Sequence, residues 1–495
     1  MVTADRPVGS DPGYLGIDLG TSSVKAVVAL ADGTVLARAS HPYPVEHPEL
    51  AHAETPAALW WDAVVRAVRA AVAEGGVDVR GIGLSGQMHG VVLTGDDLEP
   101  LHPAMLWADS RATRELDAYR ALPDGVRRRL GNPLMPGAAG PLLGWTARHT
   151  PGLLARARWA LQPKDWLRAR LTGQVASEPS DASATLLFDL IGGGWDADVA
   201  GALGVDPALL PPLLDHAGVL AGGLTPDAAA ALGLPAGLPV AAGAADAAAA
   251  SHGSGLARGT AQITVGTGAQ VVSRLAGPPA VLSDQPVTHL YRDVTGEGYY
   301  AMAAVQNAGL ALQWVLDVLR ADWDELYGAL DGEPASAQPL FVPHLTGERT
   351  PYLDPALRGS WVELSAGHTR ADLLRASLEG VAFAAADALD SLPGLAGIER
   401  LWLSGGSSND PRWCQLMADV TGRALHVVSV PDASGRGAAM LGAQAADDTD
   451  GFWTPPADAA GERALHTPRP DHHDRLTERR DRFHVVVESL RTQRA

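Results

Sequence analysis

The sequence predicts an α/β fold with two domains, and three observations lead to this prediction. The pattern apolar-x-apolar-Gly-Thr occurs at residues 17–21 and again at 263–267, about half of the 495-residue chain later. An apolar stretch follows each Gly-Thr, so each copy is expected to form a β-hairpin and a folding unit occurs twice. Apolar strands alternate with helical segments, as in α/β sheets. A chain of this length is also too long for a single core.

The first half begins with one copy of the hairpin, whose second strand is expected over Val24–Leu30. Spaced Val and Ala residues and two tryptophans then predict a helix over Pro56–Glu74. Strands over Val79–Leu84 and Val91–Leu93 enclose a polar turn, Ser85–Gly90. Because this turn follows a buried strand, it lies where open α/β sheets usually bind ligands.

Residues 100–223 are richer in Pro and Trp, and we expect them to elaborate the first domain and to shape a substrate pocket. Short helices are predicted there over Ala104–Tyr119, Leu153–Leu161 and Lys164–Leu171. The Pro- and Gly-rich segment Leu234–Pro239 is the expected hinge, and a short strand should follow it.

The second half repeats the hairpin, with its second strand over Ala269–Leu275. Helical sequence follows around Met302–Arg320, and then a loop over Phe341–Asp354. Thr369 as N-cap, with Asp372 three residues later, predicts the start of a long helix that ends near residue 389.

The last third contains a strand at Arg400–Leu403 that leads through a Gly-Gly turn into a helix from Pro411. A strand, glycine turn and helix in this order form an arrangement that contacts nucleotides. Two further helices are expected over Gly437–Ala446 and Asp471–Leu490, and the second would dock onto the fold from the C-terminal tail.

Composition excludes several classes of partner. A net charge of −19 and a pI near 5.2 argue against nucleic acid or an anionic membrane, so small molecules are the expected substrates. The single cysteine, Cys414, excludes a disulfide framework and is expected to be a packed thiol in a cytoplasmic protein. The first residues are too polar for a signal peptide, and the small-residue run Ala241–Ala250 is too short to span a membrane.

The two hairpin tips suit phosphate groups. Glycine lets backbone N–H groups crowd around an anion, while Thr21, Ser22 and Thr267 offer hydroxyl donors. Asp18 lies within the first strand, where Asp is disfavoured, and holding Mg²⁺ near phosphates would explain its presence. One Gly-Thr after an apolar run is more often an ordinary hairpin, so the hypothesis of a polyphosphate grip depends on the pair.

Four motifs, in their order along the chain, resemble the FGGY family of carbohydrate kinases: Asp18–Ser22, the segment around Asp246, the hairpin at Ile263 and Gly405-Gly406. The resemblance covers about residues 14–444. It implies two actin-like ATPase (ribonuclease H-like) domains with a cleft between them. We expect a sugar-binding domain over residues 1–245, a nucleotide-binding domain over 246–450, and a tail over 451–495 that carries the docking helix.

Within this family, residues 86–90, 106–111, 131–133, 163–168 and 180–185 are most similar to D-xylulose kinases. The resemblance implies ATP-dependent, Mg²⁺-assisted phosphorylation of D-xylulose to D-xylulose 5-phosphate. Family members often dimerise, so a homodimer stays open.

The expected chemistry needs a base, because a sugar hydroxyl has a pKa far above neutrality and attacks a phosphoryl group more readily when a carboxylate accepts its proton. Family position gives this role to Asp246, although an isolated Asp after a strand is more often a helix N-cap. Asp18 is expected to orient Mg²⁺, through water. The residues expected to bind ATP are Gly20, Thr21, Ser22, Gly266, Thr267, Gly268, Gly405, Gly406, Ser407 and Asn409.

The sugar is expected to contact Gln87, Met88, His89 and Asp109. Each has a plainer alternative: a lone histidine is often a satisfied structural residue, a methionine often packs in a core, and Arg111 could simply pair with Asp109.

Three positions depart from the family pattern. Ala247 stands where an asparagine usually follows the base, Leu142 where xylulokinases usually have lysine, and Glu363 where glycine is usual. These changes bear on the sugar more than on phosphoryl transfer. Another ketose, a polyol or a sugar acid such as gluconate is therefore an alternative substrate, and an inactive sugar- or nucleotide-binding regulator is an alternative function.

Overall fold

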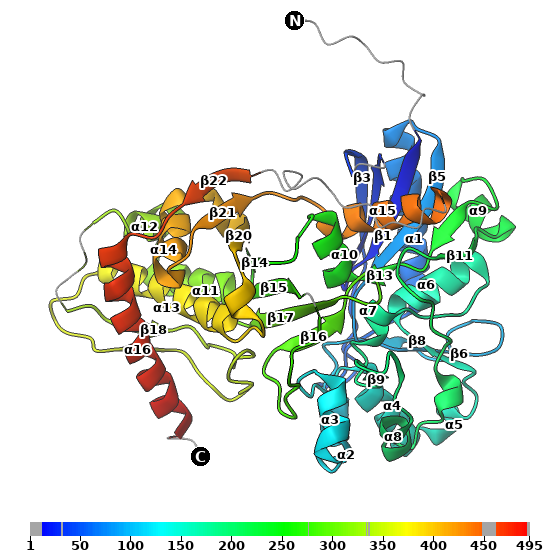
Figure 1. The fold of residues 1–495 in the computed structure, drawn as a ribbon, viewed down its shortest axis with the longest axis horizontal. Helices are drawn as coiled ribbons and strands as arrows, with labels where there is room; N and C mark the ends of the chain where they lie inside the picture. Colours follow the sequence, from blue (N-terminus) through cyan, green and yellow to red (C-terminus); the bar gives the residue numbers. More distant parts are fainter. Residues whose placement is uncertain are drawn as a thin grey trace, which may run out of the picture.

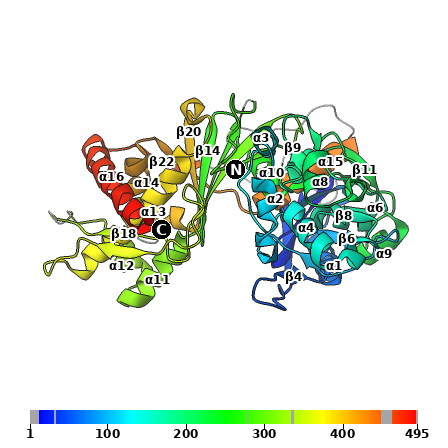
Figure 2. The ribbon, with the colours of Figure 1, turned by 90° about the horizontal axis from the view of Figure 1, so that it is seen from below.

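The protein consists of two lobes, each built around its own mixed sheet, and they lie side by side in Figures 1 and 2. The computed structural model describes residues 12–30, 33–275, 277–332, 334, 337–447 and 462–492. The first sheet contains β1 (Gly13–Leu19), β2 (Ser23–Ala29), β3 (Val35–Pro42), β5 (Val79–Gly86), β11 (Leu220–Gly223), β12 (Pro239–Ala241) and β13 (Ala244–Ala245). The second contains β14 (Thr260–Val265), β15 (Ala269–Leu275), β16 (His289–Arg292), β17 (Tyr299–Val305), β20 (Arg400–Gly405), β21 (Leu425–Val428) and β22 (Glu462–His466).

The two sheets share one topology. In the first, β3, β2 and β1 form an antiparallel meander, β1, β5 and β12 run parallel, and β11 closes the edge antiparallel to β12. In the second, β17, β15 and β14 form the meander, β14, β20 and β21 run parallel, and β22 closes the edge. The repeated hairpins, β1–β2 and β14–β15, occupy equivalent positions, which confirms the predicted α/β fold of two domains.

Helices and short strands complete each lobe. The first lobe contains α1 (Ala57–Gly75), α2 (Leu116–Arg120), α3 (Asp124–Leu130), α4 (Ala139–His149), α5 (Pro151–Leu154), α6 (Pro163–Thr172), α7 (Pro179–Ala182), α8 (Ala197–Ala202), α9 (Pro226–Leu232), α10 (Asp246–Gly253), β4 (Glu54–Thr55), β6 (Val92–Thr94), β7 (Ala104–Met105), β8 (Trp159–Leu161), β9 (Phe188–Asp189) and β10 (Gly194–Trp195). Later in the chain come α11 (Gly309–Leu319), α12 (Trp323–Gly328), α13 (Arg370–Asp390), α14 (Pro411–Thr421), α15 (Ala433–Asp447), α16 (Pro470–Thr492), β18 (Leu340–Val342) and β19 (Ser360–Val362).

Three of the predicted helices were wrong in whole or in part. Within residues 104–119 only α2 is α-helical, because Ala104 and Met105 pair with β4 as β7. Within 153–161 the last three residues form β8, which pairs with β6. Met302 lies in β17, between β15 and β16. In each case pairing with a strand distant in sequence decided the conformation, which local propensity does not encode.

The segment expected to be the hinge, residues 234–239, does not connect the two lobes. This segment joins α9 to β12 within the first lobe, where the Leu238 carbonyl accepts a hydrogen bond from the Leu224 N–H. The chain instead passes between lobes from α10 to β14 and returns from β21 to α15. The two connections lie at residues 254–259 and 429–432.

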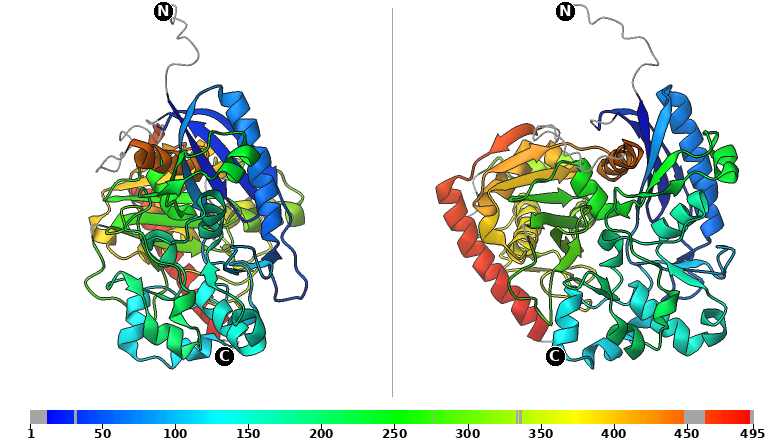
Figure 3. Two further views of the ribbon diagram at one scale, coloured as in Figure 1. Left: turned by 90° about the vertical axis from the view of Figure 1, so that its right-hand side faces the viewer. Right: turned by 45° about the vertical axis from the view of Figure 1, so that its right-hand side comes forward.

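Helix α15 comes from the second half of the sequence but packs against β5, β1 and β12 of the first sheet, and against α10 (Figure 3). Glycines on both sides allow this approach. A Cβ atom at Gly83 would lie 1.8 Å from the Ala438 carbonyl oxygen, and one at Gly16 would lie 1.9 Å from that of Gly435. The helix backbone therefore lies directly on the sheet backbone. The expected domain boundaries at 245/246 and 450/451 stay a prediction.

We expect Gly83→Ala to lower the free energy of unfolding by about 2 to 3 kcal/mol, because the new methyl group meets backbone atoms of α15 that cannot rotate away. Chemical denaturation at neutral pH measures the change. Gly201→Ala, at a helical glycine with open space around it, is the matched control and should change stability by less than about 1 kcal/mol. Equal midpoints for the two variants would contradict this account of the packing.

The predicted docking helix corresponds to α16, which packs on α14 and β18 along the outer side of the second lobe (Figure 1). Its buried side chains are Leu476, Phe483 and Val487. Residues 451–461 of the tail lie outside the described part of the chain. Cys414 is buried in α14, as predicted.

Candidate active site

The candidate site begins where three parallel strands end together. In the register of the first sheet, Asp18 of β1 and Ala244 of β13 both lie opposite Ser85 of β5. Asp246 follows β13, and the segment 87–89 follows β5. The carboxyl ends of parallel strands meet at one edge of a sheet, so two acidic side chains flank the Gln-Met-His turn.

Asp246 is the first residue of α10, and its Oδ1 atom accepts a hydrogen bond of 2.6 Å from the Ala247 N–H. The N-cap position belongs to Ala245, so Asp246 does not cap the helix. Burial and the nearby charge of Asp18 raise the pKa of Asp246 to about 7, against the opposing effect of the Ala247 bond. This carboxylate can therefore accept a proton near neutral pH.

Asp18 lies at the end of β1, where its Oδ1 atom accepts a hydrogen bond of 3.0 Å from the Ser85 hydroxyl. Burial raises its pKa, while Ser85 and Lys25 act in the opposite direction. In the described residues, no three His, Cys, Asp or Glu side chains converge on a possible metal position. A single carboxylate nevertheless suits Mg²⁺, which prefers oxygen ligands and takes most of them from water and substrate phosphates.

The first hairpin tip, residues 20–22, is held by two buried partners. The Gly20 carbonyl accepts hydrogen bonds from the Tyr43 hydroxyl and, at 3.2 Å, from Nε2 of Gln87. Trp107 Nε1 donates to Thr21 Oγ1 at 2.9 Å. The Gln87 amide thus orients the turn, and the contact with sugar expected for Gln87 stays a prediction.

His89 has a φ of 75°, and its Nδ1 atom lies 2.7 Å from the Ala184 carbonyl oxygen. Burial and the charge of Arg349 lower its pKa to about 4, against the opposing effect of the Ala184 bond. A neutral ring that donates from Nδ1 leaves Nε2 as an acceptor for a hydroxyl group. Met88 is buried, with its Sδ atom 3.9 Å from the Tyr300 hydroxyl.

Asp109 is buried, and its carboxylate is already well satisfied. It accepts bonds of 2.7 to 3.0 Å from the Arg111 guanidinium and one of 2.8 Å from the Ala53 N–H. These contacts favour the alternative in which Arg111 pairs with Asp109 and orders the loop. A direct contact between Asp109 and the sugar stays a prediction.

The second lobe contributes groups that were not predicted from the sequence. His289 and Tyr291 on β16 place their rings 6.2 and 6.1 Å from the His89 ring, and the Tyr291 hydroxyl lies 2.8 Å from His289 Nδ1. Arg349 lies close enough for its charge to lower the pKa of both histidines, which burial already lowers. The polar residues that alternate in the strand His-Leu-Tyr-Arg could have suggested a functional surface. Nothing in the sequence indicated that these side chains face His89 of the other lobe.

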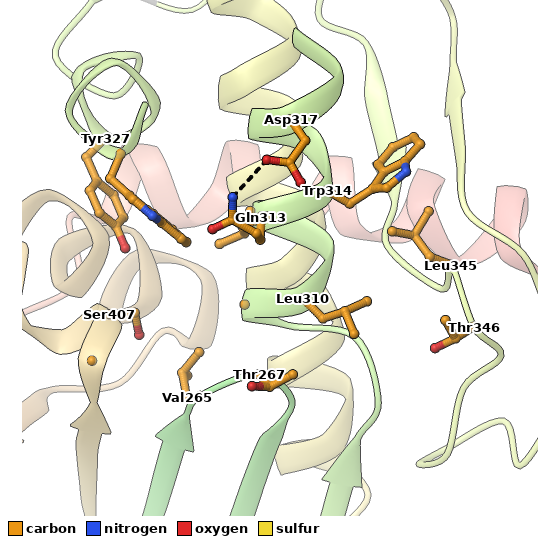
Figure 4. Close-up of a pocket in the computed structure, with 15 residues that line it drawn as sticks. Val265, Thr267, Leu310, Gln313, Trp314, Asp317, Tyr327, Leu345, Thr346 and Ser407 are labelled. Carbon is orange, nitrogen blue, oxygen red and sulfur yellow. Dashed lines mark hydrogen bonds between the residues drawn. The ribbon is translucent and has the colours of Figure 1, made fainter. Parts of the chain in front are cut away.

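A cavity of about 1010 Å³ opens at the second hairpin tip, between α11 and α12 (Figure 4). Gly266 and Thr267 line it together with Gly406 and Ser407 of the Gly-Gly turn. Residues that the sequence did not indicate complete the lining: Val265, Gly309, Leu310, Leu312, Gln313, Trp314, Asp317, Trp323, Tyr327, Leu345 and Thr346. The cavity thus joins two predicted phosphate and nucleotide turns with apolar surface suited to a flat ring.

The other residues expected at this end do not line the cavity. Gly405 has a φ of 99°, and a Cβ atom there would lie 2.1 Å from the Val265 carbonyl oxygen. A Cβ atom at Gly268 would lie 2.6 Å from the Val305 carbonyl oxygen. Asn409 accepts a hydrogen bond of 3.1 Å from Arg463. Gly405 and Gly268 therefore shape the two turns, and contacts of these three residues with ATP stay predictions.

Comparison with known proteins shows which family has this arrangement. The model of the FGGY family of carbohydrate kinases, N-terminal domain, matches residues 13–253, and that of the C-terminal domain matches residues 261–446. This chain belongs to the FGGY family. It is therefore a carbohydrate kinase that uses ATP, as the resemblance of its motifs implied.

Individual FGGY relatives carry several names. The chain is 33% identical to the xylulose kinase of Klebsiella pneumoniae over 83% of its length and 85% of the relative's. It is also 33% identical to the glycerol kinase of Alkalilimnicola ehrlichii over 87% of its length and 90% of the relative's. The crystal structure of a xyloylose kinase from Brucella ovis superposes with a TM-score of 0.88 and 31% identity, covering 97% of this chain and all of that one.

No helix among the described residues combines the length and apolar character needed to cross a membrane.

Proposed function

We propose that this FGGY kinase transfers the γ-phosphoryl group of ATP to D-xylulose, giving D-xylulose 5-phosphate. The observation that carries the proposal is the shared register of Asp18, Ser85 and Ala244, which brings two carboxylates to one edge of the sheet beside the Gln-Met-His turn. The similarity of that turn to xylulose kinases and the printed names of several relatives favour the ketose.

In the proposed reaction, Asp246 accepts the proton of the attacking sugar hydroxyl. His89 Nε2 accepts a hydrogen bond from another hydroxyl and so orients the sugar. The tips at residues 20–22 and 266–268 bind the phosphates through backbone N–H groups and hydroxyls. Asp18 would hold Mg²⁺ through water, and the bound cation would supply charge neutralisation on the phosphates.

The substrate is tested by a panel of D-xylulose, glycerol, D-ribulose and gluconate at matched concentrations with Mg-ATP, followed by release of ADP. We expect kcat/KM for D-xylulose to exceed that for each other compound by at least about tenfold. A higher value for glycerol would favour the polyol alternative, which the glycerol kinase relative and the small side chain of Ala247 support. No sugar-dependent ADP release with any compound would favour the regulator.

The cavity of Figure 4 is the proposed nucleotide site, and Gly309 tests it. The Gly309 and Leu310 N–H groups donate to the carbonyls of Gly266 and Thr267, and a Cβ atom at Gly309 would lie 2.5 Å from the Gly266 oxygen. Gly309→Val should therefore displace the second phosphate turn and raise KM for ATP by about tenfold or more.

The control for Gly309→Val is Gly201→Val, at a helical glycine with open space around it, which should leave KM for ATP within about twofold of the wild-type value. Unchanged KM in the Gly309 variant, with the protein folded, would contradict this placement of the nucleotide. The expected homodimer and cytoplasmic location stay predictions from the sequence.

A further inference from the structure

A cluster of buried ionisable side chains lies next to the strand ends that form the proposed catalytic edge of the first sheet. Lys164 Nζ, on α6, lies 2.6 Å from Asp165 Oδ1, 3.5 Å from Glu178 Oε1 and 3.6 Å from Asp181 Oδ2. Arg168 Nη1 lies 3.0 Å from Asp165 Oδ1. All five side chains are 0% exposed.

Stability alone does not account for such a cluster. Removing ions from water costs free energy that their attraction regains only in part, so apolar side chains of similar volume are often as stabilising. Burial raises the pKa of Glu178 and, more strongly, that of Asp181. The cluster, with two cations and three carboxyl groups, is neutral when one of these carboxyls keeps its proton. The role of the cluster is therefore sought in the residues that it contacts.

One chain of hydrogen bonds leads from the cluster to the proposed base. Glu178 Oε1 accepts a bond of 2.8 Å from the Ser180 hydroxyl, and Ser180 Oγ accepts a bond of 3.1 Å from the Ala245 N–H. Ala245 is the N-cap residue of α10 and directly precedes Asp246. A charged group with no exposure to solvent is thus connected to the backbone that directs the Asp246 side chain.

The neighbouring strand ends are built around the same lysine. A Cβ atom at Gly86, the residue paired with Ala245, would lie 2.9 Å from the Lys164 Cβ. Gly243 has a φ of 80°, and a Cβ atom there would lie 2.7 Å from the Leu84 Cβ on β5 and 3.1 Å from the Lys164 Cδ. Gly86 and Gly243 thus allow β5 and the segment before β13 to pack closely on the Lys164 side chain.

We propose that Lys164, Glu178 and Ser180 form a buried positioning relay that holds the first residue of α10 in place and thereby directs the Asp246 carboxylate at the substrate hydroxyl. The proposal rests on the proposed function, in which Asp246 is the base. Lys164 and Ser180 lie in residues 163–168 and 180–185, two of the motifs whose role the catalytic and nucleotide residues leave unexplained, and Glu178 lies two residues before the second motif.

The relay matters because proton transfer requires the base within hydrogen-bond reach of the hydroxyl. A displacement of about 1 Å can cost about a hundredfold in rate. Ser180 is the link that can be removed while the ion cluster remains. Ser180→Ala removes the acceptor for the Ala245 N–H and the donor to Glu178, and leaves the contacts between Lys164 and its three carboxyl partners.

The experiment compares the wild type with Ser180→Ala, Lys164→Met, Asp246→Asn and the control Ser254→Ala. Ser254 is a buried serine at the opposite end of α10, and its hydroxyl donates a hydrogen bond to the Ser251 carbonyl within the same turn. For each protein, kcat and KM are measured with Mg-ATP and the most active sugar of the panel, together with the affinity for Mg-ADP and the thermal unfolding midpoint.

We expect Ser180→Ala to lower kcat by about tenfold or more, with KM for ATP and the affinity for Mg-ADP within about twofold of the wild type. The Ser254→Ala control should keep kcat within about twofold. A general loss of structure would also weaken nucleotide binding and reduce the fraction of active protein. A lower kcat with unchanged nucleotide affinity therefore indicates that Ser180 positions the base. Lys164→Met, if it folds, should lower kcat at least as much as Ser180→Ala does. If Lys164→Met does not fold, Ser180→Ala alone tests the relay.

Two results would overturn the relay: a Ser180→Ala enzyme with kcat within about twofold of the wild type, or an equal loss of kcat in the Ser254 control. The Asp246→Asn variant separates this failure from that of the proposed function. If Asp246→Asn loses turnover while Ser180→Ala keeps it, the relay is wrong and the base stands. If Asp246→Asn keeps turnover, the base assignment itself is wrong.

Discussion

We expect Asp246→Asn to lower kcat by about two to four orders of magnitude, the range that a positioned general base contributes. The substitution keeps the size of the side chain and its contact with the Ala247 N–H, but removes the carboxylate proposed to accept the sugar proton at the edge formed by β1, β5 and β13. Steady-state kinetics with the preferred sugar measure the change.

Binding separates this loss from misfolding. Asp246→Asn should bind Mg-ADP as the wild type does, because the proposed nucleotide cavity lies at the second hairpin and does not include residue 246. Asp62→Asn, on the exposed side of α1, controls for the loss of one negative charge and should keep kcat within about twofold. An Asp246→Asn enzyme that retains more than about a tenth of the wild-type kcat would exclude Asp246 as the base.

The pH dependence is the second large effect, because the Asp246 pKa lies near 7. Only the ionised carboxylate accepts a proton, so kcat/KM should fall about tenfold for each pH unit below about 7. By about pH 5 the loss reaches about a hundredfold. The residual activity of Asp246→Asn should lack this limb. A wild-type profile that is flat from about pH 5 to about pH 8 would contradict the assignment.

The limb in kcat should lie at lower pH than the limb in kcat/KM. The free enzyme determines kcat/KM, and there the charge of Asp18 helps to raise the Asp246 pKa. In the complex that determines kcat, a bound divalent cation would offset the charge of Asp18 and favour ionised Asp246. Equal limbs in the two profiles would indicate that Asp18 and the cation lie too far from the base to affect it.

The same shift predicts how stability depends on pH. Folding raises the Asp246 pKa from 3.8 to about 7, so its protonated form stabilises the folded state below about pH 4, and this contribution is lost as the pH rises through about 7. The neutral amide of Asp246→Asn loses nothing in that window. Its melting temperature should therefore match the wild type near pH 4 and exceed it near pH 8, when both are measured without ligands.

Several features of the fold were predictable because their causes are local. The hairpin strands Val24–Leu30 and Ala269–Leu275 were predicted to within a residue, since apolar runs bounded by Gly-Thr leave few alternatives. The capping pair Thr369 and Asp372 fixed the start of α13, where both reciprocal hydrogen bonds are present.

Glu363, which stands where the family usually has glycine, has a φ of 62°, the conformation that favours glycine.

Other features depend on partners far away in the sequence. Met302 was expected in a helix because apolar residues surround it, but pairing with β15 and β16 makes it part of a strand. Helix α15 follows β21 of the second sheet in sequence but lies on the first sheet, because Gly16 and Gly83 permit contact between backbones. Sequence periodicity specifies that a helix has an apolar face, and not which sheet covers that face.

The sequence by itself determined that the chain is an acidic, two-part α/β protein with duplicated phosphate-type turns and with Asp18 and Asp246 as its exceptional acids. These conclusions follow from composition, spacing and short-range propensity. Only the tertiary structure decided that the two acids share one sheet edge, that His289 and Tyr291 face His89 from the other lobe, and that Lys164 is buried against Glu178. Such contacts arise from strand register and burial, which join residues separated by tens to hundreds of positions.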